Sequence, residues 1–233
     1  MTDFALIIDL DTTLIATHVL YQACRYLGVG VTKTHGGSVD AFDEALAWAE
    51  TRAEKALSPQ EYISPLRYPV SVGYGVYSAT GKQDVGDSVR IGCNHILQAT
   101  PDTYRDAAPF LKKVQSAGIP IHLFTHGIEN HQMMRVSESG LEPYFDSITV
   151  TLTKDEDTWG TFDNAADHII AIGDSLRHDV RPALRCGYTA IHVDRGAGWG
   201  HTDMSGESRY LVAHNLDDAG AFMKDILAGR YVK

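Results

Sequence analysis

Five short runs of apolar, mostly β-branched residues recur along the chain, and each is followed by polar residues or glycine. They are FALIID (4–9), IPIHLFT (119–125), SITVT (147–151), HIIAIGD (168–174) and YTAIHVD (188–194). Their hydrophobicity is continuous rather than alternating, which is typical of strands covered on both faces in a parallel sheet. This pattern predicts a parallel sheet with crossover helices.

Helical patterns fill the intervals between the later runs. The segments YRDAAPFLKKVQSAG, HQMMRVSESG and RPALRCG end at Gly118, Gly140 and Gly187, where a left-handed cap residue is expected. The alternation of strand and helix predicts an α/β fold with a doubly wound, Rossmann-like sheet.

Residues 17–99 break this rhythm. Apolar residues stand at helical spacing in residues 41–57 and again in 85–96. Between them, residues 58–83 are rich in Pro, Gly and Tyr and predict an irregular stretch. We therefore expect an α/β core made of residues 1–16 and 100–233, with a smaller, mainly helical domain at 17–99.

Composition excludes several classes of function. The 20 Lys and Arg against 30 Asp and Glu give a net charge of −10, which disfavours binding to nucleic acid. No stretch approaches the roughly 18 apolar residues of a membrane span, and the first apolar run has no basic flank. Cys24, Cys93 and Cys186 are widely spaced, which disfavours a disulfide framework. These features predict a cytoplasmic protein.

Polar residues follow the predicted strands where their carboxyl ends meet in a parallel sheet. They are Asp9, Asp11, Thr125, Lys154 and Asp174, with Asp179 five residues after Asp174. Four carboxylates in one crevice repel one another unless a cation lies between them. A hard cation with oxygen ligands, such as Mg²⁺, fits this set. One carboxylate is then available as a nucleophile and its neighbour as a general acid and base.

In their order along the chain, these motifs resemble those of the haloacid dehalogenase (HAD) superfamily. The matching segments are Asp9-Leu10-Asp11-Thr12-Thr13, LFTHG with Thr125, TLTKDED with Lys154, and IAIGDSLRHDV with Asp174 and Asp179. The resemblance covers the first 15 or so residues and most of 100–195. It implies that residues 17–99 form a cap that selects the substrate.

The resemblance also implies roles for the carboxylates. Asp9 would attack phosphorus, form an aspartyl-phosphate and bind Mg²⁺. Asp11 would protonate the leaving group, then activate water, with its backbone carbonyl facing the metal. Asp174 would be a further metal ligand, and Asp179 would hold a metal-bound water or pair with Lys154.

The phosphate-binding residues implied by the resemblance are Thr125, His126, Gly127 and Lys154. Lys154 would also steady Asp9. The alternative is that a lysine in so charged a loop is a solvated surface residue, in which case Arg177 would supply the positive charge. In the cap, Tyr68, Tyr74 and Tyr77 would either stack on a ring of the substrate or pack the domain's own core.

The presence of Asp11 favours a phosphatase acting on a small phosphorylated metabolite. Dehalogenases expel halide, which needs no proton, and generally lack an acid at this position. A dehalogenase, a phosphonatase and a weakly active phospho-ligand-binding protein remain the alternatives. The sequence specifies neither the substrate nor the choice between monomer and homodimer.

Overall fold

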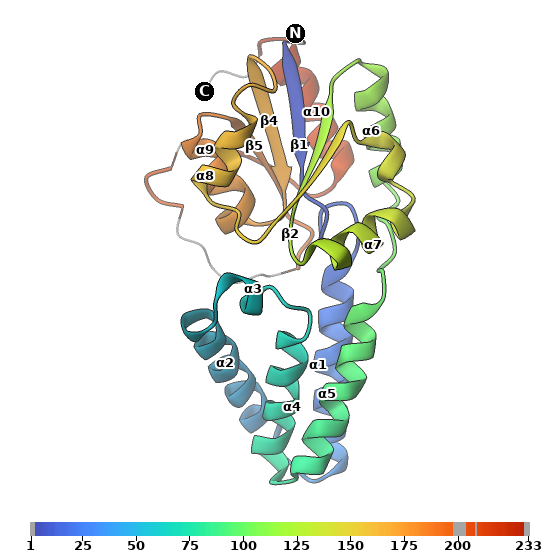
Figure 1. Cartoon of the computed structure of the whole chain (residues 1–233), viewed down its shortest axis with the longest axis vertical. Coiled ribbons are helices and arrows are strands. Elements are labelled where there is room, and N and C mark those ends of the chain that lie inside the picture. The colour runs from blue at the N-terminus through green and yellow to red at the C-terminus, as the bar shows by residue number, and fades with distance from the viewer. Residues whose placement is uncertain (1–2, 198–203, 208, 231–233) are drawn as a thin grey trace. The chain divides into compact units, whose positions relative to one another are not determined.

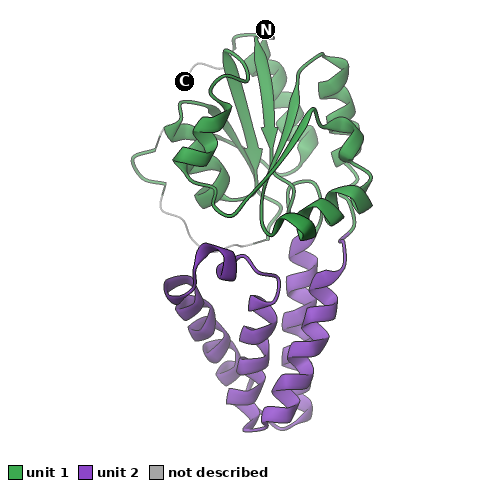
Figure 2. Cartoon of the chain, in the orientation of Figure 1, with its two compact units in different colours: residues 1–16, 102–233 green, residues 17–101 purple. Residues whose placement is uncertain are grey.

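The computed structural model describes residues 3–197, 204–207 and 209–230 (Figure 1). The chain divides into two compact units (Figure 2). Unit 1 contains residues 1–16 and 102–233, and unit 2 contains residues 17–101. Among the described residues, no helix is long and apolar enough to cross a membrane.

Unit 1 is built on a six-stranded sheet in which every pairing is parallel (Figure 1). The strands are β1 (Phe4–Ile8), β2 (Ile121–His126), β3 (Ser147–Thr151), β4 (His168–Gly173), β5 (Thr189–Val193) and β6 (Leu211–Ala213). Their order is β3-β2-β1-β4-β5-β6. The predicted parallel α/β sheet is confirmed, and β6 adds an edge strand that the sequence pattern did not indicate.

Helices cover both faces of this sheet, which explains the continuous hydrophobicity of its strands. They are α6 (Ala107–Ser116), α7 (Glu129–Ser139), α8 (Glu156–Trp159), α9 (Arg181–Arg185) and α10 (Leu216–Leu227), with short turns η1 (Glu142–Tyr144), η2 (Gly160–Phe162) and η3 (Leu176–Val180). On β1, Leu6 and Ile8 belong to the core shared with α6, α7 and α10. Ile7 between them belongs to a second core with Trp159 of α8 and Ala183 of α9.

Unit 2 consists of helices around a separate core. They are α1 (Thr17–Thr34), α2 (Val39–Ala56), α3 (Pro59–Tyr62), α4 (Arg67–Thr80) and α5 (Gln83–Gln98). Phe42 of α2, Val72 and Val76 of α4, and the thiols Cys24 and Cys93 are fully buried in this core. Both cysteines are free thiols.

The expected irregular stretch at residues 58–83 is wrong, because most of it forms α4. Glycines allow this helix to approach its neighbours closely. A Cβ on Gly73 would lie 2.8 Å from the Gly86 carbonyl of α5, and one on Gly86 would lie 2.6 Å from the Gly73 carbonyl. A Cβ on Gly75 would lie 2.9 Å from the Phe42 ring. These glycines are packing positions within helices rather than chain breakers.

The three tyrosines of α4 differ in their surroundings. Tyr68 is partly buried and its ring packs edge-on against Tyr21, with 5.0 Å between the ring centroids. Tyr74 and Tyr77 are 39% and 40% exposed. The ring centroid of Tyr74 lies 5.4 Å from that of Trp48 on α2.

Candidate active site

The carboxyl ends of four neighbouring strands bring the motif residues of unit 1 together. Asp9 directly follows β1, Thr125 is the penultimate residue of β2, and Asp174 directly follows β4. Lys154 lies three residues after the end of β3. The Asp9 backbone N–H donates to the carbonyl of Ile172, 2.9 Å away, which fixes the end of β1 against β4.

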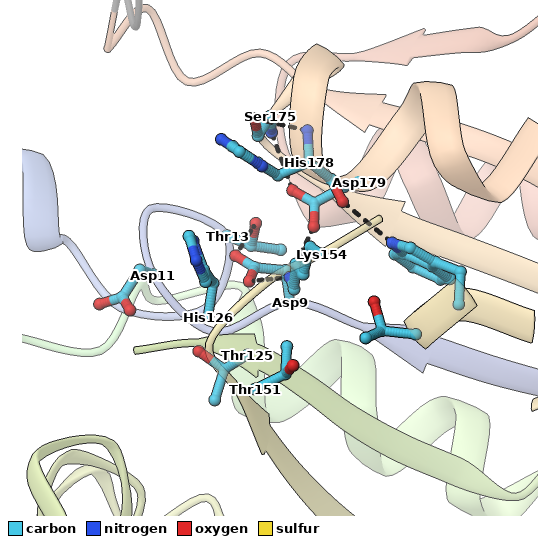
Figure 3. Close-up of polar contacts among 12 residues, drawn as sticks. Asp9, Asp11, Thr13, Thr125, His126, Thr151, Lys154, Ser175, His178 and Asp179 are labelled. Carbon is cyan, nitrogen blue, oxygen red and sulfur yellow. Dashed lines mark hydrogen bonds and ion pairs between the residues drawn. The ribbon is translucent and has the colours of Figure 1, made fainter. Parts of the chain in front are cut away.

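Lys154 lies at the centre of a buried charge cluster (Figure 3). Its Nζ donates to Asp9 Oδ1 and to Asp179 Oδ1, each at 2.6 Å. The side chain is 1% exposed, so the interpretation as a solvated surface lysine is wrong. Arg177, the alternative cation, is itself exposed.

Burial and charge act in opposite directions on this cluster. Burial, with the nearby carboxylates of Asp179 and Asp11, raises the pKa of Asp9 to about 7, although Lys154 opposes this rise. Burial disfavours the charged form of Lys154, but Asp179 and Asp9 outweigh it and raise the pKa of Lys154 above its usual value. Lys154 is therefore a permanent cation in the site.

Further hydrogen bonds orient the two carboxylates. The Thr13 hydroxyl donates to Asp9 Oδ2 at 3.1 Å, and the Ser175 backbone N–H donates to Asp179 Oδ2 at 3.0 Å. Gly173 leaves room for Asp179, because a Cβ at this position would overlap the Asp179 carboxylate. Both aspartates are thus held at two oxygens each.

Three of the four predicted metal-site aspartates fit a divalent cation. Asp9, Asp174 and Asp179 each offer one carboxylate oxygen, and these oxygens lie within 4.8 Å of one another. Ionised, the three carboxylates exceed the charge of Lys154 by two. Hard oxygen donors with this charge suit Mg²⁺.

Asp11 lies outside this group, with its side chain directed away from Asp9 (Figure 3). Arg135 Nη1 donates to Asp11 Oδ1 at 2.8 Å, and Gln132 Nε2 donates to Asp11 Oδ2 at 2.5 Å. The chain is no longer an extended strand here, because β1 ends at Ile8 and Thr12 has a φ of 61°. Alternate residues of an extended strand point to the same side, but this rule does not apply to Asp9 and Asp11, because both lie beyond the end of β1.

The predicted phosphate-binding segment is already hydrogen-bonded in part. The Gln132 amide donates to the Thr125 hydroxyl and to the His126 carbonyl, both at 2.9 Å. The Gly127 backbone N–H donates to the Thr151 carbonyl at 3.0 Å. The Gly127 N–H is thus engaged by a β3 residue in this structure, and the phosphate-binding role of Gly127 stays a prediction.

Two histidines flank the charge cluster. The rings of His126 and His178 lie 5.2 Å apart between centroids, and His126 Nε2 lies 2.8 Å from the Leu152 carbonyl. Since a carbonyl only accepts, Nε2 carries the proton and donates. Burial lowers the pKa of both histidines, that of His178 to about 4, so both are neutral near pH 7.

Sequence reasoning missed Thr13, Gln132, Arg135 and His178. Thr13 and His178 lie inside motifs that were recognised for other residues. Gln132 and Arg135 lie in no motif, but their positions in the helical pattern could have indicated that they are buried. They share one face of α7 with buried Val136, where an amphipathic helix normally has apolar residues. Polar side chains at such positions are informative because burial requires partners for them.

Comparison with known proteins agrees with this geometry. A family model described as HAD-hydrolase-like matches residues 152–219, which contain Lys154, Asp174 and Asp179. A haloacid dehalogenase-like family hydrolase from Xanthomonas campestris has a similar structure, with a TM-score of 0.77. The two chains are 20% identical, over 98% of this chain and 94% of that one. The chain has the fold of a haloacid dehalogenase-like hydrolase.

Other HAD structures are similar at lower identity. A HAD hydrolase from Bacillus subtilis, bound to magnesium, gives a TM-score of 0.65 at 14% identity, covering 96% of this chain and 99% of that one. The L-2-haloacid dehalogenase of Xanthobacter autotrophicus, with chloropropionic acid covalently bound, gives 0.60 at 13%, with the same coverage. Such likeness shows the HAD fold alone. No curated protein matches this chain in sequence.

Proposed function

We propose that this protein is a Mg²⁺-dependent phosphatase of the HAD superfamily that hydrolyses a small phosphomonoester. The observation that carries the proposal is the buried group in which Lys154 joins Asp9 to Asp179, beside Asp174. A nucleophilic carboxylate, a fixed cation and a set of oxygen ligands for a metal are the parts that phosphoryl transfer requires.

The proposed reaction uses these groups in two steps. An oxygen of Asp9 attacks phosphorus, the bond to the leaving oxygen breaks, and an acyl phosphate forms on Asp9. Asp11 gives the leaving alcohol its proton and then takes a proton from the water that hydrolyses the acyl phosphate. Asp9, Asp174 and Asp179 would hold Mg²⁺, which would supply charge stabilisation for the transferring group.

Lys154 and Thr13 prepare Asp9 for this attack. Lys154 favours the ionised form of Asp9, which is the nucleophile, and opposes the effect of burial on its pKa. The Thr13 hydrogen bond fixes the rotation of the carboxylate. A nucleophile with so little freedom gains from reduced reorganisation during the reaction.

Dehalogenation is the second candidate, and the contacts of Asp11 favour it. Arg135 and Gln132 hold Asp11 away from Asp9. Displacement of halide by Asp9 needs no proton donor, so this arrangement suits it without change. The similar structures also include L-2-haloacid dehalogenases.

One set of assays separates the two candidates. The purified protein is given p-nitrophenyl phosphate or L-2-chloropropionate, with Mg²⁺ or with EDTA, and release of nitrophenol or chloride is measured. A phosphatase cleaves the ester, stops in EDTA, and loses roughly 10²- to 10⁴-fold in rate on Asp11→Asn. Chloride release that is unaffected by EDTA and by Asp11→Asn identifies a dehalogenase.

Asp9→Asn tests the nucleophile in either case. The variant keeps the shape of the side chain and the Thr13 contact but lacks the attacking carboxylate. We expect no turnover of either substrate, with an unchanged circular dichroism spectrum. Full activity in this variant would show that Asp9 is not the nucleophile and would contradict the proposed mechanism.

A further inference from the structure

The Arg195 guanidinium joins the turn after β1 to the start of α6. Arg195 lies two residues after β5, and Asp106 directly precedes α6. Arg195 Nη1 and Nη2 donate to the two carboxylate oxygens of Asp106 at 2.9 and 3.0 Å, and Nη2 also donates to the Thr13 carbonyl at 2.9 Å. The guanidinium carbon lies 3.8 Å from the centroid of the Tyr104 ring. A planar guanidinium with these contacts has a fixed orientation.

Asp106 is itself held in place, so it anchors the guanidinium. The Leu216 backbone N–H, at the start of α10, donates to Asp106 Oδ2 at 2.8 Å. Burial raises the pKa of Asp106, but the hydrogen bonds from Arg195 and Leu216 outweigh burial and lower the pKa below its usual value. The side chains of Arg195 and Asp106 are 9% and 14% exposed, so salt screens this pair little. The ion pair therefore connects the loop after β5 to α6 and α10.

Thr13 connects this anchor to Asp9. The Thr13 carbonyl accepts from Arg195, while the Thr13 hydroxyl donates to Asp9 Oδ2 at 3.1 Å (Figure 3). Thr13 is fully buried. A β-branched side chain has few rotamers, so a hold on the Thr13 peptide also fixes the position of its hydroxyl. The contact made by Arg195 thus reaches the Asp9 carboxylate through a single residue.

The turn that contains Thr13 is strained and needs such a hold. Thr12 has a φ of 61°, and its N–H donates to the Ile15 carbonyl at 2.8 Å. The Leu14 and Ile15 N–H groups donate to the Leu10 carbonyl at 2.9 and 3.1 Å. A strained backbone persists only where its surroundings determine it firmly. Arg195 supplies a contact from the far side of the sheet's first strand, in addition to these bonds within the turn.

Resting on the assignment of Asp9 as nucleophile, we propose that Arg195 is a positioning residue. Its guanidinium, anchored on Asp106, holds the Thr13 peptide so that the Thr13 hydroxyl keeps the Asp9 carboxylate in its attacking orientation. Arg195 acts through Thr13 rather than on the substrate. Phosphatase and dehalogenase chemistry both use Asp9, so the role of Arg195 is the same in either reaction.

Amide hydrogen exchange tests the hold on the turn without any substrate. In Arg195→Met, we expect the N–H groups of Thr12, Leu14 and Ile15 to exchange about 10-fold faster or more, because the turn opens more often. The N–H of Leu6, inside the sheet, should keep its exchange rate. Unchanged exchange in the turn would overturn the inference. Equal acceleration in the turn and the sheet would also overturn it, because it would show a general loss of stability.

Kinetics test the effect on Asp9 with whichever of p-nitrophenyl phosphate and L-2-chloropropionate is turned over. Arg195→Met should lower kcat roughly 10- to 100-fold, because a displaced nucleophile reacts slowly, and should change KM by less than about threefold. Arg185→Met is the matched control, since Arg185 contacts Glu156 and Glu207 on the surface, and it should keep both constants. An unchanged kcat in Arg195→Met would overturn the inference.

A double variant shows whether Arg195 acts through Thr13. Thr13→Val keeps the shape of the side chain and removes the hydroxyl that contacts Asp9. If both residues act on Asp9 by one route, Thr13→Val/Arg195→Met should be no more than about threefold slower than the slower single variant. Losses that multiply would contradict the route through Thr13.

Two further points keep the test decisive. If neither substrate is turned over, the proposed function fails, whereas the exchange measurement still decides whether Arg195 holds the turn. If Arg195→Met does not fold, Asp106→Asn takes its place, because it weakens the anchor of the guanidinium while an amide oxygen can still accept from the Leu216 N–H. The same turn amides should then exchange faster than those of the sheet, and unchanged exchange would overturn the inference.

Discussion

Lys154 is the residue on which the charge balance of the site depends. It is the shared partner of Asp9 and Asp179, and all three side chains are at most 7% exposed. A buried ion pair contributes little net stability, but removal of one partner is costly because the other charge stays buried. The same side chain therefore affects both chemistry and folding.

We predict that Lys154→Met abolishes activity and lowers the free energy of unfolding by about 3 to 5 kcal/mol. Urea unfolding in EDTA measures the loss. The loss of unfolding free energy caused by Lys154→Met should be smaller at pH 5 than at pH 8. At pH 5, protonation of Asp9, whose pKa is already raised to about 7, removes one buried charge. Lys113→Met, which breaks a 3.5 Å pair with Asp217 on the surface, should change stability by less than about 1 kcal/mol. Equal losses in the two variants would contradict the assigned role.

Thr12 is strained in the turn between the two motif aspartates. It is a β-branched residue with a φ of 61°, a conformation that glycine adopts without cost. Its hydroxyl is buried without a hydrogen-bond partner in the structure.

We predict that Thr12→Gly raises the free energy of unfolding by about 1 kcal/mol, because it relieves the left-handed strain and removes the buried hydroxyl. Thermal unfolding monitored by circular dichroism measures the shift. Thr12→Ala serves as the control, since it removes the hydroxyl but keeps a Cβ in the strained conformation. A Gly variant less stable than the Ala variant would show that the strain is negligible.

At the scale of helices and strands, glycine packing determines how the helices of unit 2 meet. Gly73 of α4 and Gly86 of α5 face each other, so that each backbone carbonyl occupies the space of the other's missing side chain. Gly30 of α1 differs, because a Cβ there would have nothing within 4 Å. The same residue type is thus required at one position and replaceable at the other.

We predict opposite effects of alanine at these two positions. Gly86→Ala should lower the free energy of unfolding by about 1 to 3 kcal/mol, because the new methyl group overlaps the Gly73 backbone. Gly30→Ala should raise it by about 0.5 to 1 kcal/mol, because alanine favours the helix and meets no neighbour. Denaturant unfolding of both variants gives the comparison. If both substitutions raised the free energy of unfolding, the close contact between α4 and α5 would not be required for stability.

The elements that the sequence predicts are those that follow from hydrophobicity. Five strands are buried on both faces and have continuous apolar runs, so they could be found. The short β6 has 45% exposed Val212 in its middle and no such run. α4 was missed because its glycines were interpreted as breakers. The local pattern contains no information about a neighbouring helix whose carbonyl oxygen would lie 2.8 Å from a Cβ added at Gly73. The contacts of Gln132 and Arg135 with Asp11 could not be predicted for the same reason, since Asp11 is over a hundred residues distant in sequence.

At the scale of the whole molecule, both connections to unit 2 leave unit 1 at one place. The Ala16 backbone N–H donates to the Asp102 carbonyl at 2.9 Å, and the Tyr104 N–H donates to the Leu14 carbonyl at the same distance. Residues 17–101 are therefore inserted across a junction that unit 1 closes by itself. Each unit also has its own buried core.

We predict that unit 1 folds without unit 2. A variant that joins Ala16 to Asp102 through a short Gly-Ser linker should keep the parallel sheet, because the two ends are already hydrogen-bonded to each other. Cooperative urea unfolding and native tryptophan fluorescence, to which Trp159 in the second core contributes, measure the outcome. A non-cooperative transition would show that unit 1 depends on unit 2 for stability.

The Ala16–Asp102 junction also bears on the order of folding. β1 must pair with β2 and β4, yet residues 17–101 separate it from both, so closure of this long loop opposes sheet formation. The helices of unit 2 form from local contacts, and α1 packs against α5 within that unit. A folded unit 2 therefore shortens the effective loop between Ala16 and Asp102. On this basis a folded unit 2 opposes sheet formation less than an unstructured loop of equal length would, so replacement of residues 17–101 by such a loop should slow the refolding of unit 1.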